Sequence, residues 1–183
     1  MRFFVLLLSA LLPATALSAD KFTLTSAEVR PNQKIADAHV FKGFGCEGGN
    51  MSPSLAWKNA PAGTKSFAVT VYDPDAPTGS GWWHWLVFNI PSDVMSLPAG
   101  ASDPASGKLP KGAVQSRTDY GKPGYGGPCP PQGDKPHRYV FRVYALKTDK
   151  LDLDENASGA LVGYMLNANK LGVAEFTATY GRK

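Results

Sequence analysis

Three short stretches of the sequence combine acidic, imidazole and aromatic side chains. They are residues 73–77 (Asp-Pro-Asp-Ala-Pro), residues 82–85 (Trp-Trp-His-Trp) and residues 129–139, and they contain two of the three histidines of the chain, His84 and His137. Imidazole and phenol groups can donate hydrogen bonds to an anion, and an arriving anion favours the protonated imidazole. We therefore expect an anion site whose affinity weakens as the pH rises through about 6.5, the ordinary pKa of histidine.

The phase of the strands that carry these stretches predicts that their polar groups converge. Side chains alternate between the two faces of a strand. Asp73 ends an apolar row at positions 67, 69 and 71, whereas His84 begins a row at 86, 88 and 90, and His137 and Tyr139 begin a row at 141 and 143. An antiparallel hairpin across residues 74–81 would bring the first two rows to the same end of a sheet. The rows predict a concave site with an apolar floor, with Trp83 and Trp85 facing away from it.

The two aspartates, Asp73 and Asp75, have the wrong charge to bind a phosphate themselves. They are expected to orient an imidazole or to pair with a cationic group on the same ligand, so a phosphate ester with an amine would suit the site. A structural alternative is that Asp-Pro-Asp caps a turn and that each histidine serves the fold. Zinc on His84, His137 and an aspartate is chemically feasible. The aromatic and proline surroundings favour an organic anion, so we predict neither a metal nor a cofactor.

The same stretches resemble the two signature regions of the phosphatidylethanolamine-binding protein family. The matching motifs are Asp-Pro-Asp-Ala-Pro, the following Trp-x-His-Trp, and Gly-Pro-Cys-Pro-Pro leading to His-Arg-Tyr at 137–139. The similarity is greatest to the bacterial, Raf-kinase-inhibitor-like branch, in an exported form. It implies a β-sandwich fold and a small pocket for phosphate-type anions. The family's pocket residues fall on Asp73, His84, His137 and Tyr139, and its backbone donor at the pocket rim falls on Cys129. Eukaryotic members continue into a C-terminal helix, and we expect no such lid here.

The remaining pattern predicts one mostly β domain over residues 20–183. Alternating segments at 22–25, 66–73, 82–90, 138–146 and 173–180 indicate strands, and 19 glycines and 15 prolines favour many loops. A helix is expected at 159–170, capped by Ser158 and ended by Gly172. Its expected apolar stripe is Leu161, Tyr164, Met165 and Ala168. Residues 99–136 form a long Gly/Pro-rich loop, which is often functional.

The beginning of the sequence and its two cysteines indicate export. Residues 1–19 are typical of a signal peptide, with cleavage after Ala16 or Ala19, which predicts a periplasmic or secreted protein. In an oxidising compartment Cys46 and Cys129 most simply form a disulfide, the alternative being two free buried thiols. The net charge of +4 includes no block of lysine or arginine, and no other segment is long and apolar enough to span a bilayer. We expect neither nucleic-acid binding nor stable membrane insertion.

These patterns predict a non-enzymatic protein that binds a small phosphorylated or carboxylated ligand. A second hypothesis is a protein-interaction module that inhibits or modulates a hydrolase, kinase or host factor through the 99–136 loop. A hydrolase with His84 or His137 as general base is a third. The sequence contains neither a G-x-S-x-G nor an H-E-x-x-H motif, so we predict no catalytic residues.

Overall fold

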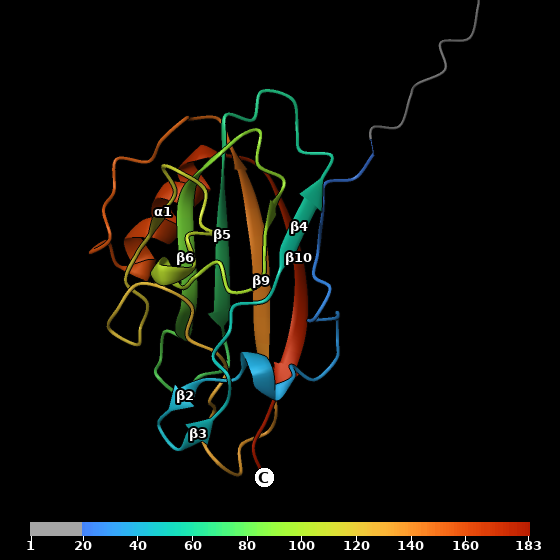
Figure 1. Cartoon of the computed structure of the whole chain (residues 1–183), viewed down its shortest axis with the longest axis vertical. Coiled ribbons are helices and arrows are strands. Elements are labelled where there is room, and N and C mark those ends of the chain that lie inside the picture. The colour runs from blue at the N-terminus through green and yellow to red at the C-terminus, as the bar shows by residue number, and fades with distance from the viewer. Residues whose placement is uncertain (1–19) are drawn as a thin grey trace, which may run out of the picture.

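A computed structural model describes residues 20–183, and its strands lie in two larger antiparallel sheets and a separate hairpin (Figure 1). The expected signal peptide and its cleavage sites lie outside the described residues. The small sheet has the order β1-β4-β7, formed by Thr23–Thr25, Leu55–Lys58 and Ser96–Leu97. The large sheet has the order β10-β9-β5-β6-β8, formed by Lys170–Tyr180, His137–Leu146, Ser66–Asp73, Trp82–Pro91 and Val114–Gln115. Strands β2 (Lys42–Gly43) and β3 (Cys46–Glu47) form the hairpin.

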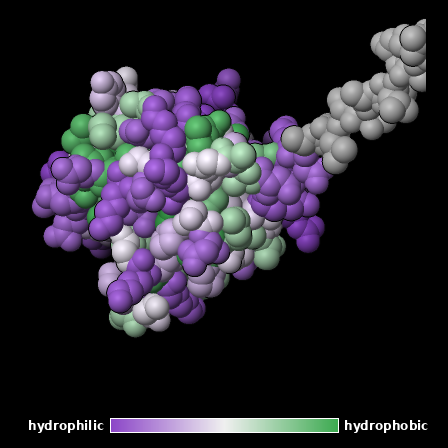
Figure 2. All heavy atoms as spheres, turned by 90° about the horizontal axis from the view of Figure 1, so that it is seen from above, coloured by the Kyte–Doolittle hydropathy of each residue, from purple (hydrophilic) through white to green (hydrophobic). Residues whose placement is uncertain are grey.

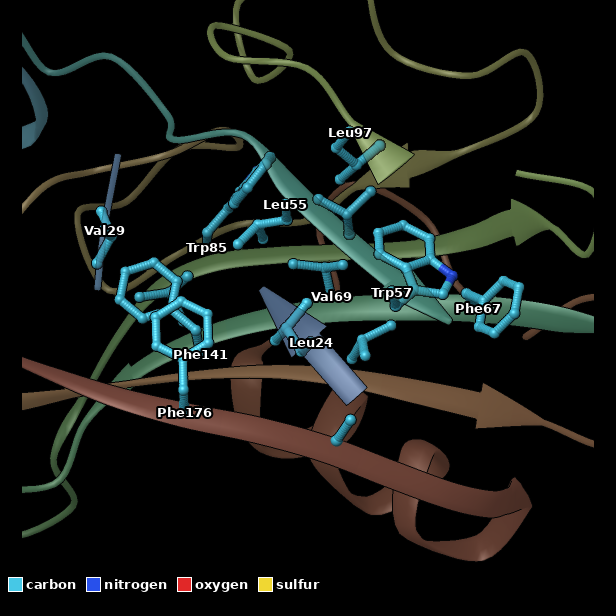
Figure 3. Close-up of a cluster of buried hydrophobic side chains, with 14 of the residues drawn as sticks. Leu24, Val29, Leu55, Trp57, Phe67, Val69, Trp85, Leu97, Phe141 and Phe176 are labelled. Carbon is cyan, nitrogen blue, oxygen red and sulfur yellow. The ribbon is translucent and has the colours of Figure 1, made fainter. Parts of the chain in front are cut away.

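The main hydrophobic core lies between the two sheets, so the fold is a β-sandwich, as predicted. The small sheet contributes Leu24, Leu55, Trp57 and Leu97, and these side chains face Phe67, Val69 and Phe141 of the large sheet (Figure 3). The rings of Phe141 on β9 and Phe176 on β10 stack with their centroids 4.9 Å apart. Strand β5, at the centre of the large sheet, is buried along nearly its whole length. A central strand covered on both faces is held rigidly, so its last residue has a fixed position.

Helix α1 (Gly159–Asn169) covers the other face of the large sheet, which makes a third layer (Figure 1). Its bounds confirm the expected helix, and the Ser158 hydroxyl caps it by accepting a hydrogen bond from the Leu161 amide. The predicted apolar stripe was wrong, because Leu161, Tyr164 and Ala168 are exposed. The helix instead buries Gly159, Val162 and Leu166. Gly159 decides this orientation, because a Cβ there would lie 2.3 Å from the ring of Trp83.

The five predicted strands are all present, whereas the short strands β2, β3, β4, β7 and β8 were not predicted. Strand β8 lies within the long 99–136 segment, together with a 3₁₀ turn at Pro104–Ser106. This segment is tied to the core through Gln115, whose side-chain oxygen accepts a hydrogen bond from the Trp85 indole at 2.7 Å. The amide nitrogen of Gln115 donates in turn to the Ser102 carbonyl at 3.0 Å. Side-chain bonds of this kind leave no periodic signal in the sequence.

The surface at the end opposite the β2–β3 hairpin is mainly hydrophilic, with hydrophobic residues in small patches (Figure 2). Apolar residues scattered in this way are normal on a protein surface. Among residues 20–183, no helix has the length and hydropathy needed to cross a bilayer.

Candidate functional site

A cavity of about 210 Å³ opens at the end of the large sheet where β5 ends and β6 and β9 begin. This end of the sheet also carries the β2–β3 hairpin (Figure 1). The cavity has a few polar groups among mainly apolar walls, and its lining residues are Phe44, Asp73, Ala76, Pro77, Thr78, Trp82, His84, Tyr120, Cys129, Pro130, Pro131, His137 and Tyr139. Asp73, His84, His137 and Tyr139 therefore lie together around one cavity, as the strand phase predicted.

A β-bulge places His84 in this cavity. In the antiparallel pairing of β5 and β6, Val71 lies opposite Trp85 and Tyr72 lies opposite Trp83, so His84 is the extra residue. The predicted row from His84 through positions 86, 88 and 90 was wrong, because Leu86 and Phe88 pack on the α1 side of the sheet. The bulge reverses the alternation, so that His84 and Trp85 both face inward. Trp85 fills the core instead of facing outward, as the strand phase predicted, and does not line the cavity.

Asp73 and His137 form a buried pair at the floor of the cavity. The Nδ1 atom of His137 lies 2.8 Å from a carboxylate oxygen of Asp73, and both side chains are almost fully buried. The other Asp73 oxygen accepts a hydrogen bond from the Asp75 amide at 2.8 Å. The Nε2 atom of His137 lies 3.4 Å from a carboxylate oxygen of Asp134. The Nδ1 atom of His137 is therefore engaged by Asp73, whereas Nε2 only approaches the partly exposed carboxylate of Asp134.

His84 has one engaged and one available nitrogen. Its Nδ1 atom lies 2.7 Å from the Gly126 carbonyl, which can only accept, so Nδ1 carries the proton. Burial lowers the pKa of the His84 imidazole, partly offset by this hydrogen bond and by the charge of Asp73. The ring is therefore neutral at neutral pH. Its Nε2 atom accepts a hydrogen bond in that state and donates one after protonation.

Two polar groups of the lining residues lack a hydrogen-bond partner among residues 20–183. They are the hydroxyl of Tyr139 and the indole N–H of Trp82, both buried. Burial raises the pKa of the Tyr139 hydroxyl, so it remains a neutral donor. A buried polar group without a partner costs about 1–3 kcal/mol. Both atoms belong to residues that line the cavity, so a ligand that reached them would satisfy them.

The wall above these groups is aromatic. Tyr120 stacks on both Phe41 and Phe44, with ring centroids 4.1 and 5.8 Å away, and meets His84 edge-on at 5.5 Å. Its hydroxyl donates a hydrogen bond to the Gly127 carbonyl at 2.8 Å. Sequence reasoning missed both Tyr120 and Phe44. Tyr120 lies in the irregular 99–136 segment, and Phe44 lies in a hairpin too short to show alternation, so neither carried a periodic signal.

A disulfide joins this wall to the rim of the cavity. Cys46 on β3 is bonded to Cys129 across 83 residues, which confirms the predicted pairing. Residues 128–131 read Pro-Cys-Pro-Pro. Because proline has no amide hydrogen, Cys129 supplies the only backbone N–H of this rim.

Asp75, the remaining predicted site residue, does not line the cavity. Its carboxylate forms two hydrogen bonds with the guanidinium of Arg138, at 2.7 and 2.9 Å. It also accepts one from the Arg138 amide at 2.9 Å. The hydrogen bonds from Arg138 lower the pKa of Asp75 to about 2. Asp75 therefore ties the loop between β5 and β6 to Arg138 on β9.

Within residues 20–183, no group of three His, Cys, Asp or Glu side chains is placed to hold a metal ion. The potential nucleophiles of the cavity wall are also engaged. Thr78 donates its hydroxyl to the Gly81 carbonyl at 2.6 Å, and Cys129 is in the disulfide. Activation of a nucleophile requires a base within hydrogen-bond reach, and neither group has one.

Comparison with known proteins gives a consistent result across the chain. The sequence profile of the phosphatidylethanolamine-binding protein family matches residues 25–181. The UPF0098 protein YbcL of Escherichia coli K12 is 62% identical over 162 residues, which cover 88% of each chain. The UPF0098 protein YbhB of the same organism is 51% identical over 157 residues, covering 86% of this chain and 98% of YbhB.

Solved structures agree with the sequence comparison. The crystal structure of E. coli YbcL, described as a new member of the mammalian PEBP family, superposes with a TM-score of 0.87 and covers 90% of this chain and all of that one. A homologue from Chlamydia trachomatis, CT736, is 30% identical with a TM-score of 0.73, covering 88% of this chain and 98% of its own.

The ion pair between Asp75 and Arg138 predicts a pH-dependent contribution to stability. Since folding lowers the pKa of Asp75 from 3.8 to about 2, the contribution is complete above the unfolded value and is lost as the pH falls through the folded one. We expect Asp75→Asn to destabilise the protein at about pH 5, with a difference from wild type that shrinks toward about pH 2. Urea unfolding at a series of pH values measures it.

Asp149→Asn is the matched control, because Asp149 is 81% exposed and lies 3.7 Å from Lys65. Solvent screens such a pair, so its removal should change stability little at any pH. A wild-type-minus-Asp75→Asn difference that stays constant down to about pH 2 would contradict the assignment.

Proposed function

The chain belongs to the phosphatidylethanolamine-binding protein family, and from that premise we propose that it is a non-enzymatic binding protein for a small phosphate-type or carboxylate anion. One observation carries the proposal. Groups without a partner, the Tyr139 hydroxyl and the Trp82 indole N–H, belong to the same cavity as the available Nε2 of His84. These two groups and the rim N–H of Cys129 can donate hydrogen bonds to an anion, and Nε2 of His84 becomes a further donor once the imidazole is protonated.

The size and walls of the cavity support a small ligand. Pockets for drug-sized molecules usually measure about 300–1,000 Å³. A volume of about 210 Å³ fits one anionic group and a short substituent. The walls of Phe44, Tyr120 and the two prolines at 130 and 131 are apolar, so a ligand that displaces the water beside them makes its hydrogen bonds in a less polar environment.

The state of the polar groups favours binding over catalysis. The Nδ1 atom of His137 is bonded to Asp73, and among residues 20–183 no hydroxyl or thiol is hydrogen-bonded to its Nε2 atom, as an activated nucleophile would be. Thr78 and Cys129, the candidate nucleophiles of the wall, are engaged as well. The site thus has fixed donors for an anion and no activated group to attack it.

We also propose that the protein acts outside the cytoplasm, in the periplasm or as a secreted protein. The pattern of residues 1–19 supports export, and the disulfide between Cys46 and Cys129 is compatible with an oxidising compartment.

Replacement of His84 tests the proposed function. We expect the mature protein to bind inorganic phosphate, measured by calorimetric titration. In His84→Gln the affinity should fall by about 10- to 100-fold, because one charge-assisted hydrogen bond contributes roughly 1.5–3 kcal/mol.

His39→Gln is the matched control. His39 is equally buried and places its Nδ1 atom 2.7 Å from the Met51 carbonyl, but it does not line the cavity. Its replacement should leave phosphate affinity unchanged in the folded protein. The proposal fails if the wild type binds no phosphate at millimolar concentration, or if His84→Gln binds as well as wild type.

The buried state of His84 predicts how affinity depends on pH. Because burial lowers the pKa of the free imidazole, an anion that pairs with its protonated form must take up a proton on binding. Affinity should therefore fall as the pH rises above that lowered pKa, by at most about tenfold per pH unit. Sulfate is the suitable probe, because it does not titrate near neutral pH. The dependence should be absent in His84→Gln, and an equally steep curve in both proteins would assign it to another group.

Because both carboxylates are engaged, we expect an amine on the ligand to have little effect on binding affinity. Asp73 is bonded to His137 and to the Asp75 amide, and Asp75 is bonded to Arg138, so neither is free to pair with an ammonium group. We expect phosphoethanolamine and methyl phosphate to bind within about threefold of each other, the scale of an exposed ion pair. Competition titrations against sulfate measure the ratio. Binding of phosphoethanolamine about tenfold tighter would instead support the pairing expected from the sequence.

A further inference from the structure

Arg182, near the end of the chain, bridges two segments that form the rim of the cavity. Its Nε atom donates a hydrogen bond to the Pro130 carbonyl at 2.7 Å, and its Nη1 atom donates one to the Gly45 carbonyl at 3.1 Å. The segments are far apart in sequence, but the β2–β3 hairpin and the C-terminus lie at the same end of the molecule (Figure 1). The guanidinium thus joins the hairpin turn to the rim.

The two bridged carbonyls are immediately beside the disulfide in sequence. Gly45 precedes Cys46, and Pro130 follows Cys129. The covalent bond and the guanidinium therefore span the same gap in parallel.

The bridged segments carry parts of the site itself. The hairpin turn carries Phe44, which stacks on Tyr120, and the rim carries Cys129, which lines the cavity. Movement of one segment away from the other would remove an aromatic wall and displace a donor at the same time.

Arginine suits this role because of its shape and permanent charge. Its planar guanidinium can donate in two directions at once and does not lose its proton. The backbone of Arg182 is held as well, since its carbonyl accepts a hydrogen bond from the Gly133 amide at 3.3 Å. The residue is thereby fixed at both ends against the loop that follows the rim.

We propose that Arg182 is a positioning residue of the cavity, which acts in parallel with the disulfide and keeps the rim in its anion-binding geometry when the disulfide is open. The inference rests on the proposed function for its affinity readout. It assigns to Arg182 a role in ligand binding without contact between Arg182 and the ligand.

A double-mutant cycle tests the parallel action. Cys46→Ser removes the disulfide without a reductant, and Arg182→Gln removes the bridge. Sulfate affinity is measured for wild type, both single variants and the double variant, with thermal unfolding to confirm that each is folded. We expect the double variant to lose at least about threefold more affinity than the product of the two single losses.

Two further variants separate this role from general effects. Arg142→Gln, which removes the exposed partner of Glu175 on β10, should show no such coupling with Cys46→Ser. Arg182→Lys keeps the charge but presents a single ammonium, so it should restore only part of the affinity in the Cys46→Ser background. Full rescue by lysine would overturn the bridging role.

Hydrogen exchange of the rim provides a readout that needs no ligand. In the double variant the amides of residues 126–133 should exchange faster than in either single variant. If exchange increases in this way but oxidised wild type binds no anion, the parallel action of Arg182 and the disulfide is supported and the proposed function fails. The positioning role of Arg182 would be overturned if the affinity loss of the double variant equalled the product of the two single losses and its rim amides exchanged no faster than those of the single variants.

Discussion

The hydrogen bond between Asp73 and His137 is the interaction on which the site depends. It joins the last residue of β5 to the first residue of β9, where the core opens to the cavity. Removal of one partner of a buried hydrogen bond leaves the other unsatisfied, at a cost of about 1–3 kcal/mol. The second oxygen of Asp73 orders the following turn through the Asp75 amide, and Asp75 in turn fixes Arg138. One buried carboxylate thereby sets two strands and the loop beside the cavity.

The cavity is a continuation of the core, not a separate feature. Tyr139 lies in the same row as Phe141 and Val143 and is itself part of the core, yet its hydroxyl has no partner among the described residues. Such a group is held rigidly by packing before any ligand arrives. A ligand that pairs with it loses little of its interaction energy to ordering the protein, which is the advantage of a preorganised site.

The sequence predicted the long strands, the helix bounds and the convergence of four polar residues, because periodicity and end groups carry those signals. It could not predict the bulge at His84, since one extra residue in a strand leaves an unbroken apolar run. The row assigned to His84 was wrong for that reason, although its place in the cavity was correct. The helix face was also missed, because Gly159 rather than a bulky residue marks the contact with Trp83. Tyr120, Phe44 and Arg182 act through contacts between distant segments, which a single sequence does not display.

The disulfide has a topological consequence besides its position at the rim. With a sequence separation of 83 between its cysteines, it closes a covalent ring that contains β4 to β8 and the exposed loop after β7. A single peptide-bond cleavage in that loop therefore leaves one covalently connected molecule. The two ends of the cut remain attached to a sandwich whose strands are still paired across the break. Such a cleavage would therefore leave the two parts of the chain joined by the disulfide.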